Sequence, residues 1–314
     1  MIVPHKNTIL EAAQRIQPYI NHTPVLTCQN LNSMFHTELF FKCENFQKAG
    51  AFKSRGACNA VFSLTENQMR NGVATHSSGN HAQALARAAK LRGIKAYIVM
   101  PKNSSKVKVE AVKSYGGIIT FCIPTLEARE TTLQKVMAET NATEIHPYNN
   151  YTIISGQATA ALELFSSVTE LDYIIAPVGG GGLLSGTALA AHYFSPKTKV
   201  LAAEPEQAND AFLSFQSKKF IPSINPNTVA DGLQTSLGNK TFPIILEHVH
   251  DILTVKESDI ISCMKLIWER MKIIVETSSA VTLAAVKNNP NLFQGKKVGI
   301  IISGGNVDLQ KLPW

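Results

Sequence analysis

Residues 173–182 have the sequence Tyr-Ile-Ile-Ala-Pro-Val-Gly-Gly-Gly-Gly, and a helical pattern follows at Leu184–Tyr193. The apolar run Tyr173–Val178 predicts a buried strand. Four glycines between a strand and a helix leave several backbone N–H groups free to surround an anion at the helix N-terminus. We therefore interpret Gly179–Gly182 as a candidate phosphate-binding turn, although a glycine run alone can also mark a tight turn.

Short β-rich runs alternate with helical patterns along most of the chain, which predicts parallel sheets covered by helices. The predicted strands are Glu38–Cys43, Val73–Ser77, Lys95–Met100, Gly117–Cys122, Glu144–Tyr148, Tyr173–Val178, Lys199–Ala203, Asp251–Val255 and Val298–Ser303. The clearest predicted helices are Ala82–Leu91, Val107–Tyr115, Leu126–Glu139, Gly156–Phe165 and Asp259–Lys272. In such sheets ligands bind at the carboxyl ends of strands, so the junction Ser77–His81 and the glycine turn are expected at one crevice.

The composition is that of a folded enzyme. The chain has 314 residues, of which 45% are hydrophobic and 17% charged. It contains no apolar run of membrane-spanning length and starts without a signal-peptide pattern, so we expect a cytoplasmic protein with no membrane partner. The net charge of +7 comes from dispersed lysines and not from a basic run, which argues against nucleic-acid binding and favours an anionic cofactor or substrate. The five cysteines lack the spacing of a zinc site.

A second informative stretch is Ala51-Phe52-Lys53-Ser54-Arg55-Gly56-Ala57, which presents one lysine among small and aromatic residues. Burial lowers the pKa of a lysine, and the neutral amine can form a Schiff base with an aldehyde. A surface lysine would be the ordinary alternative. A lysine that can hold an aldehyde and a turn that can hold a phosphate together indicate pyridoxal phosphate (PLP).

These stretches, with Ser77–His81 and Ile301–Asn306, occur in the order found in the serine/threonine dehydratases. The chain resembles that family of fold-type II PLP enzymes over nearly its whole length. The stretches Glu44–Ala57, Glu204–Asp210 and Ala230–Gly232 are similar to the serine racemase branch. The resemblance implies an α/β architecture like that of the tryptophan synthase β chain, with two open, mostly parallel sheets flanked by helices. It also implies a large PLP-binding domain at 1–71 and 150–314 and a small inserted domain at 72–149.

The resemblance implies a role for each motif residue. Lys53 corresponds to the lysine that binds PLP and removes the α-proton, and Ser78 to an acid/base on the opposite face that permits racemisation. The further PLP contacts are Asn80, Gly179, Gly180, Gly181, Gly182, Leu183 and Ser303. The substrate carboxylate would meet Ser77, Ser78, Asn80 and His81, and Arg129 could bind a second carboxylate. Without the resemblance, Ser78 and Asn80 would be interpreted as helix-capping residues.

Ser303 corresponds to the group that faces the pyridine nitrogen. An aspartate there would keep the ring protonated, whereas a serine hydroxyl leaves it largely neutral. This favours prompt loss of a leaving group from the β-carbon, with racemisation beside it.

Two further sites follow from the resemblance to the racemase branch. Glu204, the carbonyl of Ala208 and Asp210 correspond to a divalent-cation site, and hard oxygen ligands suit Mg²⁺, Mn²⁺ or Ca²⁺. The positions that correspond to ATP contacts are Lys48, Gln83, Tyr115, Lys272 and Asn306. The branch also implies a homodimer.

The predicted reaction is the dehydration of L-serine or L-threonine to a 2-oxo acid and ammonia, with serine racemisation. Three alternatives remain open: a 3-hydroxyaspartate dehydratase, a β-replacement enzyme of the cysteine synthase type, and an amino-acid or nucleotide sensor on an enzyme scaffold. Ala82, Ala158 and Thr277 stand where the family usually has glycine, glycine and proline, which bears on substrate preference more than on the cofactor.

Overall fold

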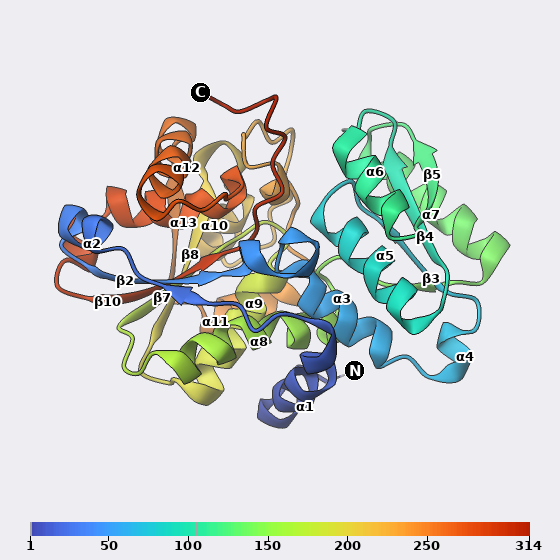
Figure 1. Ribbon diagram of the computed structural model, residues 1–314, viewed down its shortest axis with the longest axis horizontal. Coiled ribbons are helices and arrows are strands. Elements are labelled where there is room, and N and C mark those ends of the chain that lie inside the picture. The colour runs from blue at the N-terminus through green and yellow to red at the C-terminus, as the bar shows by residue number, and fades with distance from the viewer. Residues whose placement is uncertain (1, 105) are drawn as a thin grey trace.

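The computed structural model describes residues 2–104 and 106–314. Two separate sheets organise the chain, as Figure 1 shows. One has the strand order β1-β2-β10-β7-β8-β9 and the other the order β5-β4-β3-β6. Every pairing is parallel except that of β1 with β2. The predicted fold class of two open, mostly parallel sheets flanked by helices is therefore confirmed.

Apart from β1, which was not predicted, the strands lie close to their predicted positions. Their bounds are β1 Val25–Leu26, β2 Glu38–Cys43, β3 Val73–His76, β4 Ala96–Pro101, β5 Ile118–Cys122, β6 Thr143–Glu144, β7 Tyr173–Pro177, β8 Lys199–Pro205, β9 Asp251–Val255 and β10 Lys297–Ile302. The prediction of a strand over Glu144–Tyr148 was wrong beyond Glu144. There Pro147 has no N–H for a ladder, and the ring of His146 accepts the N–H groups of Tyr148 and Asn149 instead.

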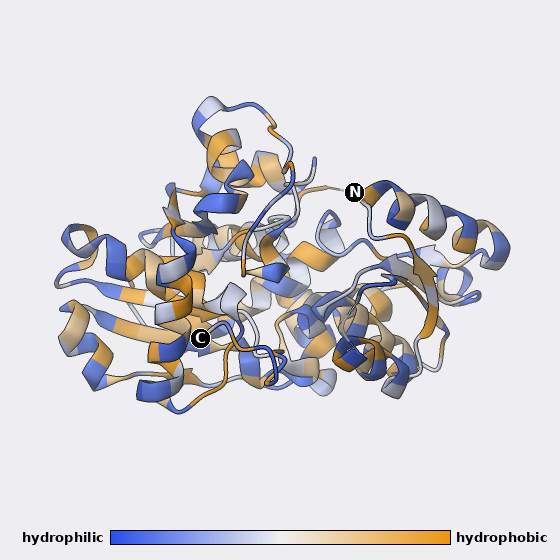
Figure 2. Ribbon diagram, turned by 90° about the horizontal axis from the view of Figure 1, so that it is seen from above, coloured by the Kyte–Doolittle hydropathy of each residue, from blue (hydrophilic) through white to orange (hydrophobic). Residues whose placement is uncertain are grey.

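The helices cover both sheets. Their bounds are α1 Lys6–Ile16, α2 Gln29–Phe35, α3 Lys53–Phe62, α4 Glu66–Met69, α5 Asn80–Arg92, α6 Lys106–Ser114, α7 Leu126–Thr140, α8 Tyr151–Ser167, α9 Gly182–Phe194, α10 Asp210–Ser217, α11 Thr241–His248, α12 Glu257–Met271, α13 Thr277–Asn288 and α14 Pro290–Phe293. Peripheral helices alternate between apolar and hydrophilic segments (Figure 2), which lets each pack one face inward. No helix in this described part of the chain is long and apolar enough to cross a membrane.

The core lies on both faces of the larger sheet and continues to the smaller one. One cluster of buried side chains packs β2, β7 and β10 against α12 and α13, and a second packs the same sheet against α8, α9 and α11. A third joins α3 to α5 and β4. Helix α3, which begins at Lys53, therefore lies where the two sheet layers meet (Figure 1). The domain bounds 1–71 with 150–314 and 72–149 stay a prediction.

Candidate active site

Lys53 is the first residue of α3, two residues after Ala51, which forms a short bridge with Gly304. Its Nζ donates to the carbonyl oxygen of Pro147 at 2.9 Å. Desolvation lowers the pKa of Lys53 to about 8, although the charge of Glu276 opposes the shift. A substantial fraction of this amine is therefore neutral near pH 8, as a nucleophile that attacks an aldehyde requires.

The glycine turn connects β7 to α9, as the sequence predicts. Gly181 has a φ of +86°, a conformation that residues with a side chain rarely adopt. Among the described residues, no hydrogen bond uses the backbone N–H groups of Gly179–Leu183 as donors. Unpaired donors at the N-terminus of a thirteen-residue helix favour an anion, so the turn fits the phosphate of PLP.

Ser303 lies at the carboxyl end of β10 and is buried. Its hydroxyl is 3.0 Å from the hydroxyl of Ser279, which in turn donates to the carbonyl of Gly304. The carbonyl of Ser303 accepts the N–H of Phe52, next to Lys53. Ser303 is thus held beside the lysine segment with a neutral hydroxyl, and no carboxylate of residues 2–104 or 106–314 forms a hydrogen bond with it.

Asn80 is the first residue of α5, and its side chain has two partners. Its Nδ2 donates to both oxygens of Glu276, at 2.9 and 3.2 Å, and its Oδ1 accepts from Asn306 Nδ2 at 2.9 Å. Burial raises the pKa of Glu276 to about 7, and the charge of Asp231 adds to the rise. The predicted PLP contact Asn80 and the predicted nucleotide contact Asn306 are therefore hydrogen-bonded to each other.

His81 is buried one residue further along α5. Its Nε2 lies 3.1 Å from the carbonyl of Ile145, and its Nδ1 has no partner. Burial and the charge of Lys53 hold the pKa of His81 well below its usual value. The neutral ring uses its Nε2 proton on a carbonyl, so its Nδ1 is an acceptor, which does not suit the predicted contact with a carboxylate.

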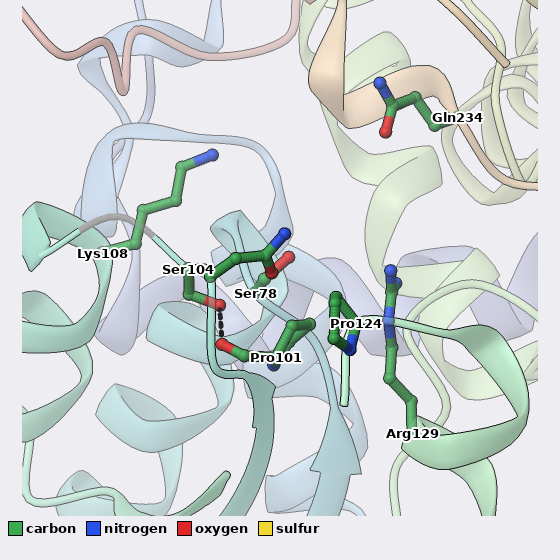
Figure 3. A pocket seen from close by; sticks show the side chains of 8 residues that line it. Ser78, Pro101, Ser104, Lys108, Pro124, Arg129 and Gln234 are labelled. Atoms are coloured by element: carbon green, nitrogen blue, oxygen red, sulfur yellow. Dashed lines mark hydrogen bonds between the residues drawn. The ribbon is translucent and has the colours of Figure 1, made fainter. Parts of the chain in front are cut away.

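A cleft of about 370 Å³ lies next to these residues and is shown in Figure 3. Its lining consists of Ser78, Pro101, Asn103, Ser104, Lys108, Pro124, Arg129 and Gln234. Ser78 lies between the cationic side chains of Lys108 and Arg129, and none of the described residues that line the cleft is acidic (Figure 3). Lys108 forms an ion pair with Asp231 from the larger sheet layer. Arg129 Nε is buried without a hydrogen-bond partner.

The predicted cation site brings two carboxylates together. Glu204 is the second-last residue of β8 and is fully buried, and its oxygens accept the N–H groups of Ala211 and Phe212 at 2.9 and 2.8 Å. Asp210 begins α10, and its Oδ2 is buried without a partner. Burial raises the pKa of Glu204 to about 8 and that of Asp210 to about 6. Ala208 lies in the turn between them. Buried carboxylates without a countercharge are costly, which fits a hard cation. No group of three or more His, Cys, Asp or Glu ligands occurs in the part of the chain described.

The predicted nucleotide contacts fall into two sets. Gln83 and Asn306 line a second cavity of about 470 Å³, together with Glu276 and Lys311. Lys48, Tyr115 and Lys272 are not among the residues that line it.

Three residues of the site were missed by the sequence analysis. Glu276 and Ser279 bond the predicted contacts Asn80 and Ser303, and Tyr148 packs on the glycine turn. Glu276 and Ser279 lie at the start of α13, a helix for which the sequence analysis had no prediction, so no sequence signal marked them. Tyr148 was predicted only as the last residue of a strand, which gave no sign of a role at the site.

The comparisons with known proteins agree with this geometry. Residues 16–304 match the family of pyridoxal-phosphate dependent enzymes. The chain belongs to that family. It is 50% identical to the beta-hydroxyaspartate dehydratase of Paracoccus denitrificans, over 314 residues that cover 100% of both chains. It is 46% identical to the L-threo-3-hydroxyaspartate ammonia-lyase of Saccharomyces cerevisiae, over 99% of this chain and 96% of the other. The crystal structure of the serine racemase from Dictyostelium discoideum superposes with a TM-score of 0.93 at 51% identity, covering 97% of this chain and 99% of that one. The predicted resemblance to the fold-type II PLP enzymes is confirmed.

Proposed function

We propose that this enzyme is a PLP-dependent dehydratase that converts a 3-hydroxy amino acid into a 2-oxo acid and ammonia, with racemisation of serine as a second activity. The observation that carries the proposal is the buried position of the Lys53 amine. It is desolvated, its pKa is lowered to about 8, and it lies where the two sheet layers meet. The relatives named as dehydratases and racemases support the same reaction class.

The residues present fit PLP. Lys53 Nζ would bind its aldehyde, the N–H groups of Gly179–Leu183 its phosphate, Asn80 its phenolic oxygen and Ser303 its ring nitrogen. Bound PLP would supply an electron sink for the pair left when the α-proton departs.

The side chains divide the proton transfers between two faces of the substrate. Lys53 Nζ, once free, would accept the α-proton on one face, and the Ser78 hydroxyl would hold or return a proton on the other. The N-terminus of α5, with Ser77, would orient the α-carboxylate through backbone donors. The hydroxyl of Ser303 carries no charge, so it does not keep the ring nitrogen protonated, and this favours loss of the β-hydroxyl.

Replacing Ser78 separates racemisation from dehydration. We expect Ser78→Ala to lower the rate of serine racemisation by roughly 100-fold or more, which is the contribution of one general acid/base. Dehydration of L-serine, which needs only the Lys53 face, should fall much less. Chiral chromatography of serine and an assay of the 2-oxo acid measure the two rates. Ser114→Ala, a solvent-exposed serine at the end of α6, is the control. Full racemisation in Ser78→Ala would refute the two-face assignment.

A 3-hydroxyaspartate substrate is the second candidate, and Arg129 favours it. The guanidinium lines a cleft in which none of the described lining residues is acidic, and its buried Nε lacks a partner. A second carboxylate on the substrate would satisfy that donor. Serine and threonine carry no such group.

The divalent cation at Glu204, Ala208 and Asp210 is also a proposal. We expect 5 mM Mg²⁺ to raise the melting temperature of the protein by about 5 °C, and EDTA to reverse the change. The shift corresponds to a Mg²⁺ concentration roughly 100 times the dissociation constant. Asp210→Asn should abolish this shift, whereas Glu206→Gln, an exposed carboxyl in the same turn, should keep it. If the same addition of Mg²⁺ leaves the melting temperature of the unmodified protein unchanged, the cation is removed from the proposal.

ATP activation, a homodimer and a cytoplasmic location stay proposals taken from the resemblance. The cavity at Gln83 and Asn306 supports the first, since it has polar lining groups and a volume of about 470 Å³. β-Replacement would be indicated if the enzyme made cysteine from sulfide without releasing ammonia from serine.

A further inference from the structure

The segment Pro147–Asn149 follows the last strand of the smaller sheet and contacts Lys53, the segment Asn239–Lys240 and the glycine turn. The carbonyl of Pro147 accepts from Lys53 Nζ at 2.9 Å. The side-chain oxygen of Asn149 accepts the N–H of Lys240 at 2.9 Å, and its Nδ2 donates to Asn239 at the same distance. Tyr148 lies in the chain between Pro147 and Asn149, and the hydrogen bonds of these two neighbours fix its backbone relative to Lys53.

Tyr148 packs directly on the glycine turn. A Cβ added at Gly180 would lie 2.5 Å from Tyr148 Cγ, and one added at Gly182 would lie 2.9 Å from Tyr148 Cβ. Real Cβ atoms essentially never come so close to another heavy atom, so the tyrosine can lie at this distance only because both positions are glycine. The side chain therefore covers the backbone of the turn whose N–H groups are free for a phosphate.

Its neighbours hold the ring in place. The ring of His146 meets that of Tyr148 edge-on, with centroids 4.7 Å apart. His146 Nδ1 accepts the N–H of Asn149 at 2.9 Å, and burial lowers the pKa of His146 to about 3, so this acceptor stays neutral and available. Burial also raises the pKa of Tyr148, while the side chain of Thr235 interacts with its hydroxyl. The tyrosine side chain is thus neutral, and its contacts hold its ring in one position against the glycine turn.

Glycine loses more backbone conformational entropy on ordering than any other residue. If the four-glycine turn were disordered without ligand, ordering it would reduce the affinity for the phosphate. We propose that Tyr148 is a positioning residue that holds Gly180 and Gly182 in the conformation that binds the phosphate of PLP. The inference rests on the proposed function, because it takes the glycine turn as the phosphate site.

The test compares two aldehydes that differ only in the phosphate. Cofactor-free full-length protein is titrated with PLP and with pyridoxal, and the dissociation constants are measured by the absorbance and fluorescence of the bound aldehyde. We expect Tyr148→Ala to raise the dissociation constant of PLP about tenfold and that of pyridoxal less than about twofold. Tyr148→Phe, which keeps the ring, should remain within about twofold of the unmodified protein for both. Tyr151→Ala, three residues along and packed on the larger core, is the matched control and should keep the preference for PLP.

The outcomes separate this inference from the proposed function. If the unmodified protein binds pyridoxal as tightly as PLP, the glycine turn is not a phosphate site and the cofactor assignment itself is overturned. If the unmodified protein prefers PLP and Tyr148→Ala keeps that preference, only the role of Tyr148 is overturned. An equal loss for both aldehydes in Tyr148→Ala would show a general loosening of the fold and would also overturn it.

Discussion

Lys53→Ala should lower every activity of the enzyme, dehydration and racemisation alike, by at least about 1000-fold. The variant loses both the amine that binds the aldehyde and the base that removes the α-proton, and each contribution is large. Ammonia release and chiral analysis of serine measure the loss. Lys53→Arg keeps the charge but not a neutral amine, so it should be as inactive as Lys53→Ala. Activity retained in either variant would contradict the assignment.

The same residue gives a prediction that does not depend on turnover. Borohydride reduction of the holoenzyme followed by peptide mass spectrometry should place a pyridoxyl group on Lys53 and on no other lysine. The rate at which cofactor-free protein captures PLP should rise about tenfold per pH unit below pH 8 and level off above it. The sign follows from the pKa of about 8, because only the deprotonated amine attacks and its fraction grows until the pH passes that value. A pH-independent rate or a pyridoxyl group elsewhere would refute the role of Lys53.

The strands and the glycine turn could be predicted because their signals are local. Tyr173–Pro177 is a continuous apolar run, and Asp251–Val255 occupies the predicted bounds. The misassigned end of Glu144–Tyr148 shows the limit of such patterns. That segment has strand-like residues, but the ring of His146 accepts the N–H of Tyr148, and the Pro147 carbonyl and the Tyr148 side chain contact Lys53 and the glycine turn instead.

The partners of the predicted contacts could not be read from the sequence, because they depend on distant contacts. Glu276 lies 196 residues from Asn80, and Ser279 lies 24 residues from Ser303. A carboxylate or a hydroxyl at a helix N-terminus is ordinarily interpreted as a cap. Only the three-dimensional arrangement shows that these two groups orient an asparagine and a serine of the candidate site.

Arg129 gives the sharpest test of substrate class. We expect Arg129→Met to lower kcat/KM for 3-hydroxyaspartate by roughly 100-fold, since a charge-assisted bond to a second carboxylate contributes about 1.5 to 3 kcal/mol. kcat/KM for serine should change by less than about threefold, because serine has no second carboxylate to lose a partner. Release of 2-oxo acid from each substrate is measured for both proteins.

The control for this experiment separates a specific contact from the general field of the cleft. Lys102→Met removes one positive charge from an exposed position near the same cleft that is not among its lining residues. It should change kcat/KM for both substrates little, because water screens an exposed charge. Arg129→Lys keeps the charge but loses the planar pair of donors, so it should recover only part of the loss. An equal decrease for serine and 3-hydroxyaspartate in Arg129→Met would mean that Arg129 shapes the cleft without binding the second carboxylate, and the preference for 3-hydroxyaspartate would then have no support in this side chain.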